Sequence, residues 1–472
     1  MSEAIVVGSG PNGLACAATL ASAGVAVTVI EAEETIGGGT RSAELTLPGL
    51  IHDVCSAGHP MAIGSPALAA LEIERRGFDW ALPEVDVAHP LDGGGGAAIV
   101  HSIEQTAAGL GEDGGAWRRV FGPSAKHFDA LREDIMQPVL RVPHHPLRLT
   151  SFGLRSMAPA TVLARSFRSA QTRALFGGVA AHGFAPLNRP FSSAVAMAMI
   201  SAGHRYGWPV ARGGSQSIAD VLAAIVLEHG GRIETGRPVR SLAELPAADA
   251  VVLDLAPGAV VELAGGRLPR GVDRAYRRYR HGPAAFKLDL AVEGGVPWTH
   301  EDSRRAGTVH AIGSFEETVL AEREVNRGRM PASPFVLVCQ QYLADPSRSQ
   351  GDLHPVWAYA HVPSGYDGDA TEPLLDQIER FAPGFRERIV ARVATTPAQM
   401  TEHNANFIGG DVITGANTPW QLLFRPRFAR NPYETGIPGV YICSAATPPG
   451  AGAHGMGGYN AAQSVLRTLG SG

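Results

Sequence analysis

The sequence is poor in lysine and carries little excess charge. Its 40 basic residues include lysine only at Lys126 and Lys287, and the formal net charge of the 472-residue chain is −5. Such a balance gives no general attraction for nucleic acid, and we expect no nucleic-acid partner. No run of about 18 apolar residues occurs, so the sequence predicts no transmembrane helix. The N-terminus shows no basic segment followed by an apolar core, and we therefore expect a cytoplasmic protein without a secretory signal.

Cysteine is also scarce. The four residues are Cys16, Cys55, Cys339 and Cys443, and they form no C-x-x-C or C-x4-C pair. Redox disulfides and structural zinc sites use closely spaced cysteines, so this spacing supports neither. No other metal-ligand spacing is found, and the sequence predicts scattered buried thiols in a reducing compartment.

A glycine-rich motif opens the chain. Residues 4–7 form a β-branched apolar run typical of a buried parallel strand, and a small-residue helical pattern and a second strand at 25–30 follow. Between strand and helix stands the G-x-G-x-x-G spacing of Gly8, Gly10 and Gly13. The first glycine permits a tight turn, the second lets the backbone approach a pyrophosphate, and the third lets helix and strand pack closely. With Pro11 and Asn12 at the helix N-terminus, the turn predicts a site for dinucleotide phosphates.

Glu31 and a second glycine cluster follow this motif. Glu31 ends the second strand, where the motif places a carboxylate for ribose hydroxyls, and it would repel a 2′-phosphate. Residues 37–39 are glycines, followed by Thr40 and Arg41. This cluster resembles that of the glutathione-reductase-like flavoproteins, in which a loop after the second strand crosses the FAD. The two features together favour FAD over NAD(P).

The nucleotide pattern is interrupted and then resumed. A helix with an i, i+3, i+4 apolar stripe follows Gly213 and Gly214, and residues 250–257 again predict a buried strand. Between these and the C-terminus, residues 283–293 alternate in polarity. With strands at 335–339 and 356–361 they predict a mostly antiparallel sheet that forms one wall of a substrate cavity. This order indicates discontinuous domains.

Turn and cap residues predict several local elements. Residues 42–64 indicate a hairpin followed by a loop that would lie over the cofactor, and the glycines of residues 91–100 indicate a second hairpin. Ser102 is expected to begin a helix, and Thr371 is expected to cap a helix over 371–381.

Residues 135–219 contain no aspartate or glutamate but nine arginines. The arginines are interleaved with apolar residues, which suits peripheral contact with an anionic membrane surface or the mouth of a lipid tunnel. Binding of an acidic substrate or partner is a second interpretation. Ion pairs with acids elsewhere in the fold are the third, since 45 acidic residues are present.

The second strong motif lies in the last 35 residues. Residues 439–443 predict a buried strand, and a glycine-rich segment and a closing helix follow. Glycines before a helix again provide close backbone approach and free N–H groups. A flavin uses such groups where negative charge develops on reduction.

With both ends considered, the chain resembles the phytoene desaturase-like FAD-dependent oxidoreductases, within a broader class that includes the amine oxidases. The nearest group is that of the pyridine nucleotide-disulfide oxidoreductase domain-containing proteins, which are phytoene dehydrogenase-related. The resemblance is carried by residues 6–14, 36–41, 213–215 and 439–462. Ala451, Ala453 and His454 depart from the Pro-Gly-Gly-Gly-Val that such proteins often show, which affects the local flavin environment and specificity.

The resemblance implies an α/β fold, with a glutathione-reductase-like Rossmann FAD domain and an α+β substrate domain on a mostly antiparallel sheet. The FAD domain is expected at 1–75, 213–275 and 425–472, and the substrate domain at 76–212 and 276–424. FAD would be bound non-covalently. The residues expected at the cofactor are Gly8, Gly10, Pro11, Asn12, Gly13, Glu31, Ala32, Gly38, Gly39, Thr40, Arg41, Val239, Ala445, Gly452, Gly455, Met456 and Asn460.

The chemistry implied is hydride transfer from a C–H bond of a hydrophobic, isoprenoid- or lipid-like substrate to flavin N5. No second nucleotide fingerprint occurs, so oxygen or a quinone is the expected electron acceptor. An FAD-dependent amine or alcohol oxidase is an alternative. A binding protein without flavin on the same fold is another.

Few side chains stand out as catalytic. His454 lies within the C-terminal glycine segment, where a structural role competes with contact to flavin or substrate. Lys287 matches the type of lysine that holds a water near N5 in amine oxidases, but its spacing to Asp289 favours an ion pair. The further candidates for the cavity are His52, His59 and His403. Cys443 precedes the glycine segment, so covalent flavin attachment is not expected.

Overall fold

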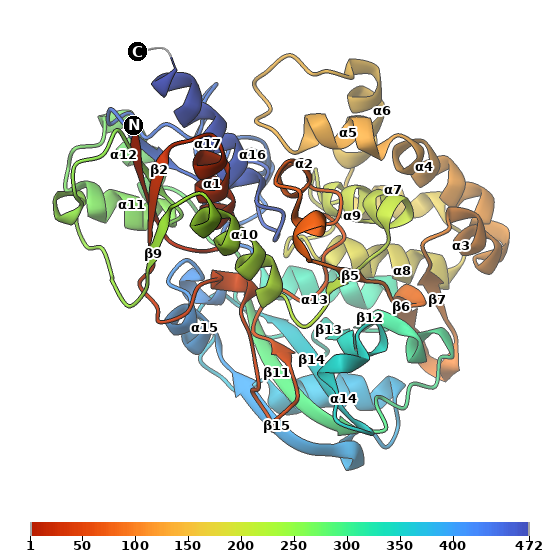
Figure 1. Ribbon diagram of the computed structural model, residues 1–472. Helices are drawn as coiled ribbons and strands as arrows, with labels where there is room; N and C mark the ends of the chain where they lie inside the picture. Colours follow the sequence, from red (N-terminus) through yellow and green to blue (C-terminus); the bar gives the residue numbers. More distant parts are fainter. Residues whose placement is uncertain (1, 471–472) are drawn as a thin grey trace.

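The structure, a computed structural model, describes residues 2–470 and contains two large sheets (Figure 1). The first has five parallel strands in the order β16-β10-β1-β2-β9. Its members are β1 (Glu3–Val7), β2 (Ala26–Ile30), β9 (Arg232–Glu234), β10 (Ala250–Leu253) and β16 (Val440–Ile442). The apolar runs of the sequence predicted these strands, which come from three separate stretches of the chain.

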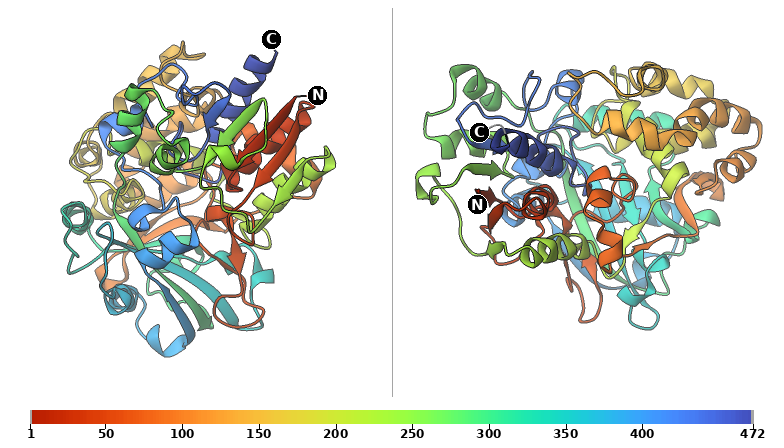
Figure 2. Two further views of the ribbon diagram at one scale, coloured as in Figure 1. Left: turned by 90° about the vertical axis from the view of Figure 1, so that its left-hand side faces the viewer. Right: turned by 45° about the horizontal axis from the view of Figure 1, so that its top comes forward.

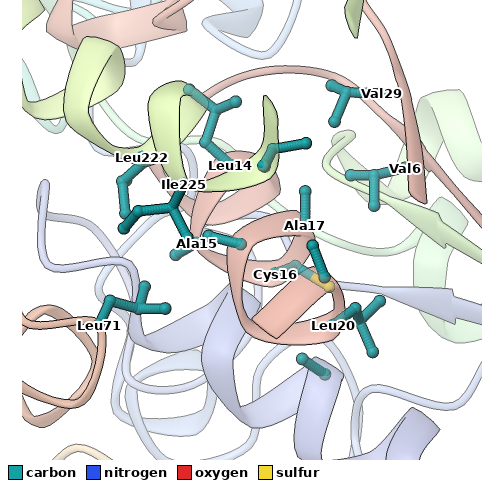
Figure 3. Packing of buried hydrophobic residues seen from close by; sticks show 14 of the residues in the cluster. Val6, Leu14, Ala15, Cys16, Ala17, Leu20, Val29, Leu71, Leu222 and Ile225 are labelled. Carbon is teal, nitrogen blue, oxygen red and sulfur yellow. The ribbon is translucent and has the colours of Figure 1, made fainter. Parts of the chain in front are cut away.

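Helices cover both faces of this parallel sheet. One face carries α1 (Pro11–Ser22), α10 (Gln216–Glu228) and α17 (Met456–Leu469), and the other carries α11 (Pro257–Ala264) and α12 (Arg270–Arg277). Figure 3 shows Leu14 and Ala17 of α1 among side chains of the sheet and of α10. Successive residues of β1 enter opposite clusters, as the period of two in a strand requires.

The second sheet has seven strands in the order β15-β11-β14-β13-β12-β6-β7, and only the β12–β6 pair is parallel. This confirms the expected mostly antiparallel sheet. Its strands are β6 (Val85–Pro90), β7 (Gly96–Ile99), β11 (Ala284–Glu293), β12 (Ala306–Ala311), β13 (Val336–Cys339), β14 (Leu353–Val362) and β15 (Ile389–Thr395). Both faces are buried at β11, because α14 (Thr371–Phe381) covers one face and the cavity described below lies against the other.

Two predicted hairpins and one predicted helix start are present. β3 (Ser42–Ala43) pairs with β4 (His52–Asp53), β6 pairs with β7, and Ser102 caps α3. The prediction that Thr371 caps α14 is wrong. Thr371 is the first helical residue, and its N–H donates to the side chain of Asp369 at 2.8 Å. The N-cap position is occupied by Ala370, so the side chain of Asp369, just before the cap, satisfies this N–H group.

The segment that follows β7, residues 103–206, is mostly helical. It lies beside the parallel sheet, and the seven-stranded sheet lies below both in Figure 1 (see also Figure 2). Its helices are α3 (Ile103–Gly109), α4 (Gly114–Lys126), α5 (Phe128–Ile135), α6 (Pro146–Ser156), α7 (Ala160–Leu163), α8 (Ala170–Ala181) and α9 (Ala194–Tyr206). The other elements are α2 (Pro66–Ala70), β5 (Trp80–Ala81), β8 (Val210–Ala211), α13 (Phe315–Val325), α15 (Pro397–His403) and α16 (Pro419–Leu423). None of the helices found in residues 2–470 has both the length and the apolar character needed to cross a bilayer.

The acid-free segment 135–219 is partly neutralised by acids from outside it. Five of its nine arginines form ion pairs: Arg141, Arg168, Arg173, Arg205 and Arg212. The interpretation as internal ion pairing thus accounts for about half of these charges. On α6, Leu147 and Leu154 remain exposed at 86% and 69%.

Candidate functional site

The turn between β1 and α1 has no room for side chains at its three glycines. Gly8 has a φ of +98°, and its N–H donates to the carbonyl of Ile30 at 2.8 Å. A Cβ at Gly13 would collide with the carbonyl oxygen of Gly8, and one at Gly10 would lie 2.7 Å from Oδ2 of Asp254. The turn therefore presents bare backbone, which is what close approach of a phosphate requires.

The C-terminal glycine segment lies directly against this turn. α17 begins at Met456 after Gly455, whose φ is +66°. Oδ1 of Asn12 accepts a hydrogen bond from the N–H of Gly457 at 3.1 Å, and a Cβ at Gly458 would collide with the backbone of Asn12. The N-termini of α1 and α17 thus meet, although they are more than 400 residues apart in sequence. Two positive helix ends at one place favour a bound anion.

The second glycine cluster closes over the same turn. The N–H of Gly37 donates to the carbonyl of Ser9 at 2.9 Å, and a Cβ at Gly38 would lie 3.0 Å from Cα of Gly10. The residues Gly38–Thr40 form a short 3-10 helix. Arg41 follows, and its guanidinium donates to the carbonyl of Thr35 at 2.7 Å.

Glu31 is buried at the end of β2. Its Oε2 accepts hydrogen bonds from the backbone N–H and the hydroxyl of Ser9, at 2.8 and 2.5 Å, and Oε1 lies 3.8 Å from Arg41. Two further residues expected at the cofactor, Ala32 and Val239, do not line the cleft described below. Ala32 is exposed, and Val239 packs on the cluster beneath the other face of the sheet.

A cleft runs between these segments, here called the glycine cleft. Of the residues expected at the cofactor, seven line it: Gly10, Pro11, Asn12, Gly39, Thr40, Ala445 and Gly452. Met456 and Asn460 are buried in α17 behind it, and the side-chain amide of Asn460 donates to the carbonyl of Met136. The roles of all these residues in binding stay predictions.

A larger cavity, here called the apolar cavity, adjoins the glycine cleft and has a volume of about 320 Å³. Alternate residues of the seven-stranded sheet form one wall: Ala285, Lys287, Thr308, Leu337, Cys339, Trp357 and Tyr359. The loop at 55–62, after the first hairpin, forms another. The cavity and the cleft share Cys55, Ser56, Val412, Ala451, Gly452 and Ala453. The two spaces are therefore adjacent, with these six residues lying between them.

Lys287 both forms an ion pair and lines the apolar cavity. Its Nζ lies 2.7 and 2.5 Å from the two carboxylate oxygens of Asp289, and both side chains are buried. His52 lies on the far side of this pair, with Nδ1 3.4 Å from Asp289. The expected pairing is present, and it does not remove the lysine from the cavity wall.

Burial holds the histidines and cysteines of the apolar cavity in their neutral forms at physiological pH. Burial lowers the pKa of His59 to about 4 and that of His182 to about 3. Burial raises the pKa of the Cys55 and Cys339 thiols to about 12. The side-chain cations that line the cavity are thus Lys287 and Arg425.

The remaining histidine and cysteine candidates lie outside both spaces. Nδ1 of His454 accepts from the N–H of Met456 at 3.2 Å, and burial lowers the pKa of His454 to about 4, which suits a structural role. His403 is not among the residues that line the cleft or the cavity, although its backbone carbonyl accepts from Arg41. Cys443 is buried, and burial holds the pKa of its thiol well above the usual value.

Several residues that line the two spaces carry no signal in the local sequence. Asp254, Asn404, Asn406 and Phe407 line the glycine cleft, and Arg425 lines the apolar cavity. Of these residues, only Asp254 could have been predicted. It directly follows β10, which is parallel to β1, and ligands bind beyond the carboxyl ends of such strands.

The donors of the glycine cleft fit the phosphates of FAD. Glycine backbone, the N-terminus of α1 and the side chains of Asn404 and Asn406 line it. One carboxylate, Asp254, lines it, and burial raises the pKa of that group to about 6. The adjoining apolar cavity places hydrophobic side chains where a ligand in the cleft would end.

Comparison with known proteins agrees with this geometry. Residues 6–71 match the NAD(P)-binding Rossmann-like domain family. Pyridine nucleotide-disulfide oxidoreductase domain-containing protein 2 of Mus musculus is 24% identical over 99% of this chain and 94% of its own. Hydroxyneurosporene desaturase of Cereibacter sphaeroides is 24% identical over 99% of this chain and 98% of its own.

A solved structure of putrescine oxidase shares the fold, with a TM-score of 0.61, 16% identity and 99% of each chain covered. At such identity the likeness concerns the fold alone. The α/β architecture with a Rossmann-like part and a second, mixed sheet is therefore shared with putrescine oxidase. These comparisons confirm the resemblance to desaturase-like and amine-oxidase-like flavoenzymes, and they support an oxidoreductase that uses FAD.

Proposed function

We propose that this protein is an FAD-dependent oxidoreductase that removes a hydride from a C–H bond of a hydrophobic substrate, in the manner of a dehydrogenase or desaturase. The observation that carries the proposal is that the glycine cleft and the apolar cavity lie side by side and share six lining residues. A dinucleotide held in the cleft would direct its reactive end into a space that binds apolar molecules. FAD supplies the hydride acceptor, N5 of its ring.

The chain's own residues would bind, orient and exclude water. Trp357 and Tyr359 present apolar surface on the sheet wall, and Phe184 and Trp208 line the same space. A volume of about 320 Å³ lies within the range of small-molecule sites, of roughly 300–1,000 Å³. Holding a C–H bond in one orientation is the main contribution that such walls make.

We further propose that the part with the parallel sheet is a glutathione-reductase-like FAD domain and that the rest of the chain is the substrate domain. Every strand of the parallel sheet falls within 1–75, 213–275 and 425–472, and every strand of the seven-stranded sheet falls within 76–212 and 276–424. Oxygen or a quinone as acceptor is also proposed. So is peripheral membrane contact through 135–219, which the exposed leucines of α6 support.

An amine or alcohol oxidase is the second candidate. Lys287 at the cavity wall favours this candidate, because a lysine there could hold a water molecule beside the flavin ring. One observation counts against a cationic amine as substrate: none of the residues described as lining the apolar cavity is an aspartate or glutamate. A protonated amine would therefore meet cations without a carboxylate.

Anaerobic bleaching of the bound flavin tests the function. The purified protein is first checked for flavin absorbance, which a flavin-free binding protein would lack. It is then mixed without oxygen with carotenoids, lipid alcohols and amines. Bleaching by an isoprenoid or lipid substrate supports the proposal, whereas bleaching by amines alone would assign an amine oxidase. Reoxidation by oxygen or by a soluble quinone then identifies the acceptor.

A further inference from the structure

The two cations of the apolar cavity differ in how their charge is balanced. Lys287 lies against both oxygens of Asp289. Arg425 is equally buried, at 3% exposure, but its guanidinium meets only neutral acceptors. These acceptors are the carbonyl of Gln421 at 3.2 Å, the carbonyl of Ala445 at 3.3 Å and Oδ1 of Asn417 at 2.7 Å.

No carboxylate within residues 2–470 forms an ion pair with Arg425. Asp411 is a buried carboxylate of the same region, since Asp411 and Arg425 both act on the pKa of Tyr279, in opposite directions. Asp411 is engaged elsewhere, because it accepts hydrogen bonds from the N–H groups of Gly282 and Gly415 at 2.7 and 2.8 Å. A guanidinium out of water without a counter-charge is costly, so the structure retains an unbalanced charge at the cavity wall.

Donor capacity is also left over. A guanidinium carries five N–H groups, and the bonds above use three. Gly450, which also lines the cavity, lies beside the group, and a Cβ there would come within 2.8 Å of Nη1. The backbone of Gly450 therefore packs closely against the guanidinium, which still belongs to the cavity lining. Paired N–H groups of an arginine suit a carboxylate in bidentate geometry.

The surroundings of Arg425 indicate what such a carboxylate would be attached to. Leu422, Val195 and Met199 line the same cavity, together with the aromatic rings already described. Arg425 does not belong to the lining of the glycine cleft. We propose that Arg425 anchors the carboxylate of an amphipathic acid whose apolar body occupies the cavity, so that the substrate of the enzyme is a hydrophobic acid. This inference rests on the proposed function for its catalytic meaning, but the binding itself does not.

One other anion could use the same group, namely the negative charge of reduced flavin. The two sources predict different measurements. An anchor for substrate changes the binding of acids, whereas a partner of flavin changes the midpoint potential and the affinity for sulfite.

Calorimetric titration of the purified holoprotein tests the anchor. The probes are 4-phenylbutyrate and decanoate, each compared with its neutral amide. We expect both acids to bind more tightly than their amides, and Arg425→Gln to weaken the acids roughly ten- to one-hundred-fold while leaving the amides unchanged. Arg425→Lys should give an intermediate loss, because it keeps the charge but not the fork. Arg427→Gln is the matched control, since its guanidinium donates to the carbonyls of Asn431 and Glu434 and does not line the cavity.

The outcomes separate cleanly. Equal binding of acids and amides by the unaltered protein would overturn the proposal without any variant, so a folding defect in Arg425→Gln cannot hide the answer. Retained acid preference in a folded Arg425→Gln, or a changed flavin potential with unchanged acid binding, would also overturn it. Acid binding that depends on Arg425 in a protein that no substrate bleaches would uphold the anchor and count against the proposed reaction instead.

Discussion

Oδ2 of Asp254 accepts a hydrogen bond from the backbone N–H of Gly13 at 2.9 Å, inside the turn that is proposed to hold phosphates. Asp254 lies 241 residues further along the chain and reaches the turn because β10 runs parallel to β1. A carboxylate beside a phosphate site opposes the binding of an anion. Burial, together with the nearby Glu31, raises the pKa of Asp254 to about 6 from 3.8, so the group changes charge within an accessible pH range.

We predict that Asp254 makes FAD binding and stability depend on pH. Its raised folded-state pKa contributes stability that is complete below about pH 4 and is lost as the pH rises through about 6. Asp254→Asn should remove this loss, which is worth up to about 3 kcal/mol for a shift of two units. The variant should also bind FAD with less pH dependence, because its amide does not ionise, and the amide oxygen can still accept from the N–H of Gly13. Fluorescence titration with FAD and thermal unfolding, each between about pH 4 and pH 8, measure both effects, and parallel pH curves for the two proteins would contradict the prediction.

Gly10→Leu should abolish FAD retention. The Cβ would lie 2.7 Å from Oδ2 of Asp254, and the rest of the side chain would fill the glycine cleft. The flavin-to-protein ratio after desalting gives the measurement, with circular dichroism to establish that the variant is folded. Gly258→Ala serves as the control, because this glycine of α11 has open space around it. A folded Gly10→Leu that carries its full complement of flavin would refute the assignment of the phosphate turn.

The strands around this site were predictable, and their order was not. Runs such as residues 4–7 and 250–257 are apolar enough to identify buried strands by themselves. The meeting of Asn12 with Gly457 followed from the resemblance, because both glycine segments were expected to hold one cofactor. The neighbours that come from long-range topology, such as Asn404, were missed since nothing near them in sequence marks a ligand.

The charged residues of the cavity show the same limit. The pairing of Lys287 with Asp289 was predicted from their spacing on one strand. The unbalanced charge of Arg425 could not be predicted from the sequence, because nothing near an arginine in sequence shows whether an acidic side chain will reach it in the fold. The error at Thr371 has a local cause instead, since the helix begins one residue earlier than expected and the side chain of Asp369 accepts from the N–H of Thr371.

Lys287→Met should destabilise the protein by about 3–5 kcal/mol, because Asp289 would keep a buried charge without its partner. The double variant Lys287→Met/Asp289→Leu should recover most of that loss. Thermal or urea unfolding measures both. Arg277→Met, which breaks the exposed pair with Asp273, is the control and should cost less than about 1 kcal/mol.

The double variant also separates the two roles of Lys287. If the lysine serves only the ion pair, the stable double variant should reduce its flavin with an identified substrate as fast as the unaltered protein. If it also acts at the cavity wall, flavin reduction should be slowed although stability is restored. A double variant no more stable than Lys287→Met would show that the buried charge of Asp289 is not the source of the loss.

We finally predict that α6 contacts anionic membranes. Leu147 and Leu154 are exposed, and Arg148 and Arg155 of the same helix form no ion pair with a described acid. These side chains together should make the protein co-sediment with phosphatidylglycerol vesicles at low salt. High salt should release it, because screening weakens the attraction between the arginines and the anionic lipid. Arg148→Glu/Arg155→Glu and Leu147→Ser/Leu154→Ser should each reduce co-sedimentation. Leu227→Ser, at an exposed leucine of α10, should not. An unaltered protein that stays in the supernatant with these vesicles would leave the four side chains without a lipid role and would favour the acidic-partner interpretation of residues 135–219.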